Sequence, residues 1–523
     1  MSNQYDVLIL GSGIAGLASA IKLAEKKYKI AIVTRESDPK ISNSYWAQGG
    51  IIYSKLGQDN PHELALDIMK ASSNTSSEKA IDMLISKSAE IVEEVLFKKV
   101  QTDFSRDEDG ELKFTKEAAH SRERIIYKGD FTGKEIQISL LNYLSDKKLF
   151  PNVTFLTGHT AIDLITPSHH GVDIRQRYEG DQVVGAYIFN QSSGEVLKVM
   201  AKKTILATGG IGALYLHHSN SGGSRGDGMA MAKRAGAFVT NMEFVQFHPT
   251  TFFHRSSHRR FLITEAIRGE GGILLNSKGE RFMKKYHPDH ELAPRDVVAR
   301  AILEEMISSK DDCVYLDISH KESTWLKERF PTIYEYCLEH KVDITSMPIP
   351  VVPAAHYTCG GVKSDTKGRT NLNHLYAVGE VACTGLHGAN RLASTSLLEG
   401  LTWGYTAGID IDFQLKNATF YDHTQIKDWE TASGECDLSL IAQDWMTLRQ
   451  TMWNYVGLSR SKNRLNRARA MFSELSDEIN RFYRHSELHD ELIGLRNGVE
   501  VAFMVLNASL RNKESIGCFY LKD

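Results

Sequence analysis

The residues that decide the fold are Tyr5-Asp6-Val7-Leu8-Ile9-Leu10-Gly11-Ser12-Gly13-Ile14-Ala15-Gly16, an apolar run that ends in a turn with three glycines. A helix-like segment extends from this turn to Lys27, and a second apolar run occupies residues 30–33. Strand, glycine turn, helix and strand in this order are typical of the start of a dinucleotide-binding unit, in which a pyrophosphate lies at the helix N-terminus. The pattern predicts an α/β fold but does not separate NAD from FAD.

The end of the second apolar run leaves open how the adenosine ribose is recognised. Thr34 stands where an acidic residue usually contacts that ribose, and Arg35 and Glu36 follow it. Recognition by Glu36, by a hydroxyl group and by a backbone contact are therefore alternatives.

Three further segments favour FAD over NAD. Residues 44–51 contain an amide, Gln48, followed by two glycines, and residues 206–210 end a buried run in small residues. Residues 376–380 end another buried run in Glu380. Small residues allow the backbone to approach a large flat cofactor, and a carboxylate can accept hydrogen bonds from ribitol hydroxyls.

The pattern of buried runs predicts a dinucleotide fold that is interrupted and later resumed. Residues 204–207 and 375–378 are short buried runs, and the composition between about 236 and 353 is mixed, with many His and Arg. We therefore predict a Rossmann-like FAD-binding domain with an inserted α+β capping domain and a C-terminal helical domain. The predicted domains are 1–240 with 354–420 for FAD, 241–353 for the cap, and 421–523 for the helical bundle.

Helical periodicity marks three amphipathic segments. Residues 77–98 place Ile81, Leu84, Ile91 and Val95 near one face. Two apolar stripes in the C-terminal region predict two packed helices: Trp445, Leu448 and Met452; and Leu465, Ala468, Phe472, Leu475, Ile479 and Phe482.

Composition excludes several classes of protein. The 523 residues are 42% apolar and 24% charged with a formal net charge of -3, so no global charge favours nucleic acid or an anionic membrane. The six cysteines are far apart and form no CxxC pair, which argues against a metal site and a disulfide framework. No apolar run reaches the length of a membrane span, and no leader pattern precedes the first glycine turn. We expect an untargeted cytoplasmic protein.

Several mid-chain segments are rich in groups that suit a small dianion. They are residues 247–250, 264–272, 293–296, 356–361 and 388–394. Arginine matches a carboxylate in a bidentate way, and histidine or threonine can complete its shell.

Together these motifs resemble the succinate dehydrogenase/fumarate reductase flavoprotein superfamily, and within it the L-aspartate oxidase family. The resemblance extends from Tyr5 to about Asn512. In the succinate dehydrogenases a histidine five residues before the glutamine of the AQGG motif bonds covalently to the flavin. Asn43 occupies that position here, so the resemblance implies FAD held without a covalent bond.

The resemblance also implies roles for individual residues. His248, Thr264, His356 and Arg391 bind the two substrate carboxylates, and Arg295 donates or accepts the proton. Because a guanidinium stays protonated far above neutral pH, Arg295 needs a specially arranged relay. Glu117 and Glu265 complete the predicted catalytic set, with Glu117 paired to a substrate amino group. The implied FAD contacts are Gly11, Ser12, Gly13, Ile14, Ala15, Gly16, Arg35, Ser44, Ala47, Gln48, Gly49, Gly50, Ile51, Asp227, Glu380, Ser396 and Leu397.

The implied activity is oxidation of L-aspartate to iminoaspartate with O2 or fumarate as acceptor, the first step of NAD biosynthesis through quinolinate. A transient contact with quinolinate synthase follows from the same resemblance. Three alternatives stay open: a soluble fumarate reductase or succinate dehydrogenase-type flavoprotein, an electron-carrying subunit whose helical tail docks an iron–sulfur partner, and a non-catalytic binding protein. One departure concerns residues 513–519, where Ile516 replaces the family's arginine and a histidine is missing. That segment is remote from the arginine motifs in sequence, and its role in subunit packing or acceptor access stays open.

Overall fold

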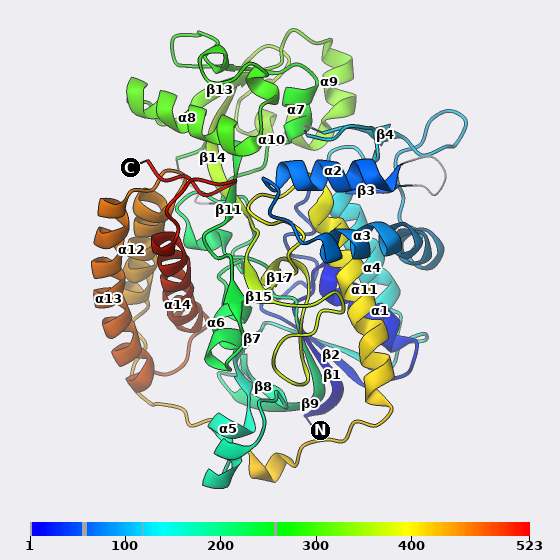
Figure 1. The fold of residues 1–523 in the computed structure, drawn as a ribbon, viewed down its shortest axis with the longest axis vertical. Helices are drawn as coiled ribbons and strands as arrows, with labels where there is room; N and C mark the ends of the chain where they lie inside the picture. Colours follow the sequence, from blue (N-terminus) through cyan, green and yellow to red (C-terminus); the bar gives the residue numbers. More distant parts are fainter. Residues whose placement is uncertain (1–2, 55–59, 118, 256–258, 523) are drawn as a thin grey trace.

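A central seven-stranded sheet organises the molecule (Figure 1). The computed structural model describes residues 3–54, 60–117, 119–255 and 259–522. The strand order is β6-β2-β1-β9-β8-β7, and β16 pairs with the C-terminal end of β9. Strands β6 (Val153–Thr157), β2 (Ile30–Thr34), β1 (Gln4–Leu10), β9 (Val196–Leu206) and β16 (Leu375–Ala377) pair in parallel. Strand β8 (Gly185–Asn190) pairs antiparallel with β9 on one side and with β7 (His159–Ile165) on the other. The interruption of the fold is confirmed, because β16 rejoins this sheet after a long excursion.

Helices α1 (Ile14–Ala24) and α11 (Thr395–Leu415) pack closely against each other. Their contact depends on Gly400, Gly404 and Gly408, which are four residues apart and therefore lie on one face of α11. A Cβ atom on Gly404 would lie 2.3 Å from the carbonyl oxygen of Ala15. Helix α4 (Thr132–Ser145) packs on α1, and α3 (Glu78–Ile91) packs on α11. The expected helix over 77–98 is present, with its last turns forming the π-helix η1 (Val92–Lys99) and all four marked apolar residues buried.

A separate antiparallel sheet lies above the central one in Figure 1. Its strand order is β11 (Val245–Phe252), β14 (Ile349–Thr358), β13 (Val314–Asp317) and β12 (Ile273–Leu275). Helices α7 (Glu265–Gly269), α8 (Arg295–Ser309), α9 (Ser323–Arg329) and α10 (Pro331–Glu339) accompany it, around a core of its own. This region has the α+β character expected of the cap, while the proposed domain boundaries stay a prediction.

Three long helices form the C-terminal region: α12 (Leu438–Val456), α13 (Lys462–His485) and α14 (Asp490–Arg511). The two apolar stripes lie on α12 and α13 and are buried except for the half-buried Phe482. Helix α14 shows no single stripe because it is enclosed by α12 and α13 and by α6 (Asp227–Arg234), so apolar residues surround its axis. Within the described residues, none of the helices combines the length and apolar character that crossing a membrane requires.

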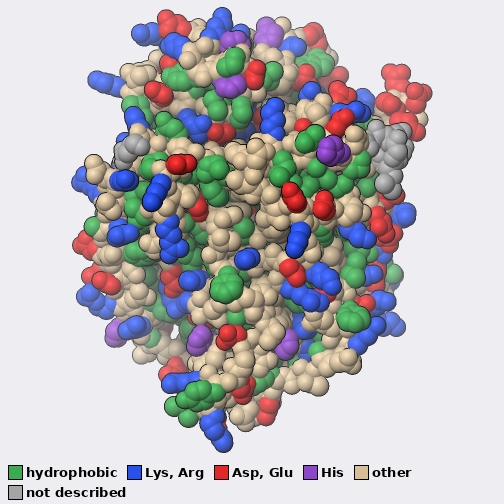
Figure 2. All heavy atoms as spheres, in the orientation of Figure 1, with side chains coloured by type: hydrophobic (Ala, Val, Ile, Leu, Met, Phe, Trp, Pro, Cys, Tyr) green, Lys and Arg blue, Asp and Glu red, His purple; other side chains and the backbone are tan. Residues whose placement is uncertain are grey.

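Shorter elements connect these layers. Two small sheets comprise β3 (Ile51–Ile52), β5 (Ile125–Ile126) and β4 (Phe114–Thr115), and β10 (Val239–Thr240), β15 (Gly361–Lys363) and β17 (Ala382–Cys383). The short helices are α2 (Pro61–Ala71), α5 (Pro167–His170), η2 (Ile174–Tyr178), η3 (Gly212–Leu214), η4 (Met283–Lys285), η5 (His290–Leu292), η6 (Gly379–Val381) and η7 (His423–Gln425). Acidic and basic side chains are interspersed over the face drawn in Figure 2.

We predict that Gly404→Ala destabilises the protein, because the new Cβ would force α1 and α11 apart at a backbone contact. The expected loss is ~1–3 kcal/mol in the free energy of unfolding, measured by urea denaturation of the cofactor-free protein. Gly180→Ala is the control, since no atom lies within 4 Å of a Cβ built there. Equal unfolding midpoints for the two variants would contradict this account of the helix contact.

Candidate active site

The glycine turn after β1 brings two backbone segments into close contact. Gly11 has a φ of 119°, and a Cβ on it would lie 2.1 Å from the carbonyl oxygen of Ala207. A Cβ on Gly16 would lie 2.3 Å from the carbonyl oxygen of Gly11. The N–H of Ile14, at the start of α1, donates a hydrogen bond to Ser44 Oγ at 3.0 Å. The turn therefore places the N-terminus of α1 at the surface of a cavity.

One continuous cavity begins at the end of β2, passes the N-terminus of α1 and ends between β11, β14 and α8. Its lining includes every residue that is predicted to bind substrate or to take part in catalysis: Glu117, His248, Thr264, Glu265, Arg295, His356 and Arg391. It is also lined by the predicted cofactor residues except Gly16 and Ile51. Those two do not reach the lining, because Gly16 is buried behind Gly11 and Ile51 is buried in β3 opposite Ile126.

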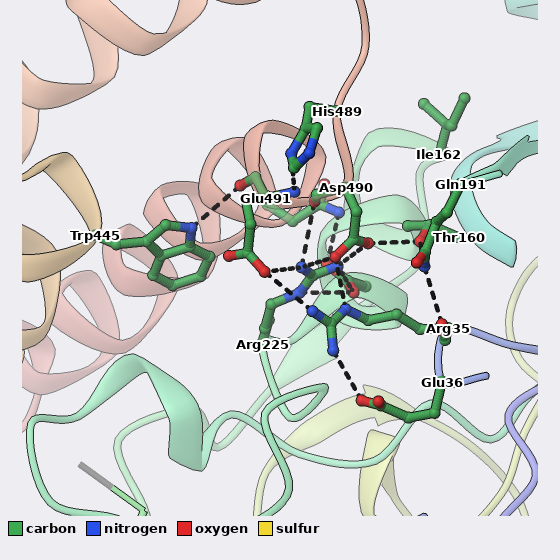
Figure 3. A network of polar contacts seen from close by, with 12 residues as sticks. Arg35, Glu36, Thr160, Ile162, Gln191, Arg225, Trp445, His489, Asp490 and Glu491 are labelled. Carbon is green, nitrogen blue, oxygen red and sulfur yellow. Dashed lines mark hydrogen bonds and ion pairs between the residues drawn. The ribbon is translucent and has the colours of Figure 1, made fainter. Parts of the chain in front are cut away.

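Arg35 and Asp227 line the cavity, but their charged groups are bound to neighbouring side chains. Figure 3 shows these contacts for Arg35. The Arg35 guanidinium donates to Glu36, Asp490 and Glu491. The Asp227 carboxylate accepts from Arg225 and from Asn497 at 2.8 Å. If Arg35 or Asp227 contacts a cofactor, its charged group is therefore already fixed by hydrogen bonds within the protein.

Polar groups at the centre of the cavity have hydrogen-bonding capacity left over. Asn43 Nδ2 donates to Glu380 Oε2 at 3.0 Å, and Glu380 Oε1 accepts from the backbone N–H of Thr358 at 3.0 Å. Burial raises the pKa of Glu380 to about 7. Gln48 Oε1 and Thr208 Oγ1, on two residues of the cavity lining, have no hydrogen-bond partner within the described residues. Buried polar atoms without partners are costly, so this arrangement suits a polar ligand.

Gln246 joins the two arginines at the other end of the cavity and was not among the predicted site residues. Its Oε1 accepts from Arg391 Nε at 3.2 Å, from Arg391 Nη2 at 3.1 Å and from Arg295 Nη1 at 3.4 Å. Its Nε2 donates to Asn390 Oδ1 and to the carbonyl oxygen of Arg391. The available signal was spacing: Gln246 precedes His248 by two residues in a strand, and such residues share a face.

Acidic side chains offset part of the positive charge of the arginines. Glu265 forms ion pairs with Arg295 and with Arg268, the latter at 3.5 Å. Burial alone would raise the pKa of Glu265, but Arg295 and Arg268 outweigh it and hold that pKa below its usual value. Burial, followed by the charge of Arg295, lowers the pKa of Arg391.

The two predicted histidines lie together and are neutral at ordinary pH. The ring centroids of His248 and His356 are 5.2 Å apart, and His356 Nδ1 lies 2.8 Å from Ser219 Oγ. Burial and the positive charges of the arginines lower both pKa values well below the usual range. The histidines therefore contribute neutral hydrogen-bonding groups rather than cations.

Glu117 and Thr264 complete the wall of the cavity. Glu117 Oε2 accepts from Ser394 Oγ at 2.8 Å, and its burial raises its pKa above the usual value. Thr264 caps α7 by accepting from the N–H of Ala266. The divergent C-terminal segment also reaches this region, because the N–H of Cys518 donates to the carbonyl oxygen of Ala389 at 2.9 Å and its Sγ lies 3.0 Å from Asn390 Oδ1. The segment is remote from Arg391 in sequence but adjacent to it in space.

Comparison with known proteins agrees with this geometry. The family described as an FAD binding domain matches residues 6–397. The L-aspartate oxidase of Pseudomonas aeruginosa is 41% identical over 527 residues, covering 99% of this chain and 95% of that protein. The L-aspartate oxidase 1 of Ralstonia nicotianae is 42% identical over 524 residues, with coverage of 99% and 95%. This chain belongs to the L-aspartate oxidase family.

A structural comparison supports the same fold. A variant of the E. coli quinol fumarate reductase superimposes with a TM-score of 0.88 at 28% identity, covering 99% of this chain and 91% of that one. Membership of the family establishes FAD as the cofactor and confirms the predicted superfamily.

We predict that Gln246→Leu weakens dicarboxylate binding about tenfold, because both guanidinium groups lose the acceptor that orients them. The measurement is titration of the purified flavoprotein with fumarate or succinate, followed by the flavin absorbance. Gln443→Leu, on the exposed face of α12, is the control. Unchanged affinity in the Gln246→Leu protein would show that the arginines are positioned without it.

Proposed function

We propose that this protein oxidises L-aspartate to iminoaspartate, with O2 or fumarate reoxidising its FAD. The observation that carries the proposal is the burial of Arg295 and Arg391 around a common acceptor, Gln246, at the end of the FAD cavity. By family membership the reaction is the first step of NAD biosynthesis through quinolinate. A cytoplasmic location, consistent with the scattered cysteines, and a transient contact with quinolinate synthase are part of the proposal.

The residues around the cavity suit FAD along its whole length. The N-terminus of α1 faces a pyrophosphate, and Glu380, Asn43 and Gln48 offer acceptors and donors to a ribitol chain. The Asn43 amide cannot form the covalent flavin bond that a histidine forms, so the cofactor is held by these contacts. When bound, FAD supplies the two-electron chemistry by accepting hydride from the substrate.

The charge around the arginines favours a small dianion. Arg268, Arg295 and Arg391 are opposed by ionised Glu265, which leaves two positive charges when Glu117 is protonated. Fumarate and succinate carry two negative charges and neutralise this site. An uncompensated buried charge is strongly unfavourable, so a neutral total favours binding.

Aspartate requires one further change, and Glu117 supplies it. With two carboxylates and an ammonium group, aspartate carries one negative charge and neutralises the site only when Glu117 is ionised. An ionised Glu117 then also pairs with the ammonium group and can receive its proton. Glu117 therefore lets the same pair of arginines accept aspartate in one protonation state and fumarate in the other.

Arg295 and Glu265 form the remaining acid–base pair. Arg295 Nε is in direct contact with Glu265 Oε2. If the guanidinium gives up a proton to the substrate, the carboxyl group of Glu265 is close enough to replace that proton. This is the relay that an arginine needs to exchange a proton during dicarboxylate interconversion. His248, His356 and Thr264 hold the carboxylates as neutral groups.

A soluble fumarate reductase is the second candidate, because fumarate would bind to the same group of residues, His248, Thr264, His356 and Arg391, here called the clamp. Comparing aspartate oxidation with succinate oxidation by the purified chain separates the two. Peroxide release by the chain alone separates an oxidase from a subunit that needs an iron–sulfur partner.

We predict that Arg391→Leu lowers kcat/KM for L-aspartate at least about 100-fold, because a substrate carboxylate loses its buried charged partner. The protein should keep its yellow colour and flavin spectrum, since Arg391 belongs to the substrate end of the cavity. Arg255→Leu, which removes an exposed ion pair with Asp312, is the matched control. Wild-type turnover in the Arg391→Leu protein would refute the clamp.

We predict that Glu117→Gln lowers kcat/KM for aspartate about 10- to 100-fold, because the ammonium group loses a charged acceptor. Fumarate binding should survive. In the wild type, fumarate affinity is complete below the raised pKa of Glu117 and declines as the pH rises through it, since ionisation adds a negative charge. The variant cannot ionise, so its fumarate affinity should not show this decline. A parallel decline in Glu117→Gln, measured by fumarate titration at several pH values, would assign the dependence to another group.

A further inference from the structure

The start of α14 is bound to the end of β2 by a network of charged side chains (Figure 3). Arg35, directly after β2, donates from Nε to Asp490 Oδ2 at 2.8 Å and from Nη2 to Glu491 Oε1 at 3.0 Å. Its Nη1 donates to Glu36 Oε1 at 2.7 Å. The guanidinium plane of Arg35 is therefore fixed by three carboxylates, two of which belong to the first turn of a helix 455 residues away in sequence.

A second arginine joins the same helix turn to the cavity. Arg225 is 1% exposed and donates to both carboxylate oxygens of Asp490 at 3.1 Å. It also donates to Asp227 Oδ2 at 3.0 Å, and Asp227 lines the cavity. The Arg225 guanidinium lies against Gly494, where a Cβ would come within 2.4 Å of its Cζ. Helix α14 is thus shaped to receive this arginine.

The charges of the network argue for orientation rather than attraction of phosphate. Arg35 and Arg225 face four carboxylates, on Glu36, Asp227, Asp490 and Glu491. The network therefore carries an excess of negative charge, and neither guanidinium is a free cation for the pyrophosphate. The N-terminus of α1, next to the glycine turn, would hold the pyrophosphate instead. The network adjoins the end of the cavity beside β2, where the neutral adenosine of FAD would lie.

We propose that Asp490 and Glu491 are positioning residues for FAD: they hold Arg35, and through Arg225 also Asp227, in the arrangement that receives the adenosine half of the cofactor. The proposal rests on the proposed function, in which the cavity holds FAD with its pyrophosphate at the N-terminus of α1, so that the end of the cavity beside β2 would receive the adenosine. Asp490 is the central member, because Thr160 Oγ1, on another residue of the cavity lining, also donates to its Oδ1 at 2.5 Å. The C-terminal helices thereby belong to the cofactor site although α14 itself does not line the cavity.

A reciprocal effect follows from this coupling. If docked α14 strengthens FAD binding, bound FAD must strengthen the docking of α14 by the same factor. The start of α14 should then exchange its amide hydrogens more slowly in the FAD-bound protein than in the cofactor-free protein.

The experiment measures the Kd of FAD for cofactor-free protein by flavin fluorescence. Glu491→Gln is the main variant, because its side chain is 40% exposed and its loss leaves the fold little disturbed. Glu500→Gln is the matched control: it also removes an ion pair that ties α14 to the body, to Arg234 at 2.6 Å, but Glu500 does not contact Arg35 or Arg225. Asp490→Asn and Arg35→Gln complete the set.

We expect Glu491→Gln and Asp490→Asn to raise the Kd of FAD about tenfold, within the range of ordinary coupling energies, and Glu500→Gln to leave it unchanged. At saturating FAD, kcat for aspartate should equal that of the wild type. Hydrogen exchange of residues 490–494 should slow on FAD addition in the wild type but much less in Arg35→Gln.

Each contrary result has a distinct meaning. If Glu491→Gln and Glu500→Gln weaken FAD binding equally, the effect reflects the general stability of α14, and the proposal is overturned. Weaker FAD binding in Arg35→Gln with unchanged binding in both Glu491→Gln and Asp490→Asn would overturn the positioning role while leaving the adenosine placement intact. Unchanged binding in Arg35→Gln would overturn that placement itself, and aspartate oxidation by the same protein would show that the proposed activity stands.

Discussion

The active site is built around the mutual repulsion of two arginines, the buried Arg391 and the largely buried Arg295. Arg295 and Arg391 share one acceptor atom, Gln246 Oε1, and burial with this repulsion lowers the pKa of Arg391. A buried pair of like charges persists only where surrounding groups are rigid and opposite charge is close. Gln246 holds the two guanidinium groups in place, and Glu265 supplies one negative charge. In the proposed function, a dianionic ligand supplies the remaining negative charge. Substrate preference is therefore a consequence of charge that the fold leaves uncompensated.

The architecture explains how these cations are assembled. Strands β11 and β14 carry His248 and His356, while Thr264 and Glu265 stand at the start of α7 and Arg295 is the first residue of α8. A cation at a helix N-terminus is disfavoured by the helix dipole, and the ion pair with Glu265 offsets this. Arg391 and Ser394 come from the loop before α11, whose glycines pack on α1. The helix proposed to face the pyrophosphate and the loop proposed to bind substrate thus both adjoin the packed pair of α1 and α11.

Sequence predicted the elements whose signals are local. The glycine turn, the individual buried runs that form parallel strands and the stripes of α12 and α13 each depend on residues close together in the chain, and the structure contains them. Gln246 was not predicted because its spacing from His248 is only a weak signal, and its contact with Arg391, 145 residues later, cannot be read from the sequence. Helix α14 was not predicted because buried residues surround most of its axis, so its sequence has no single apolar stripe of helical period. The ion-pair partners of Arg35 were not predicted, because an ion pair between residues 455 positions apart produces no recognisable sequence pattern.

The single clamp also constrains the order of events. Within the described part of the chain, the residues suited to a dicarboxylate line one end of one cavity, so under the proposed function aspartate and fumarate compete for the same position when fumarate is the acceptor. Electrons taken from aspartate must therefore stay in the protein while the product leaves and the acceptor enters. A bound two-electron carrier such as FAD can hold them through that interval, which fits a cavity in which the predicted dicarboxylate residues and the predicted FAD residues are continuous. In the proposed function, the buried carboxyl of Glu117 would then adjust the charge of the site to the ligand that is present.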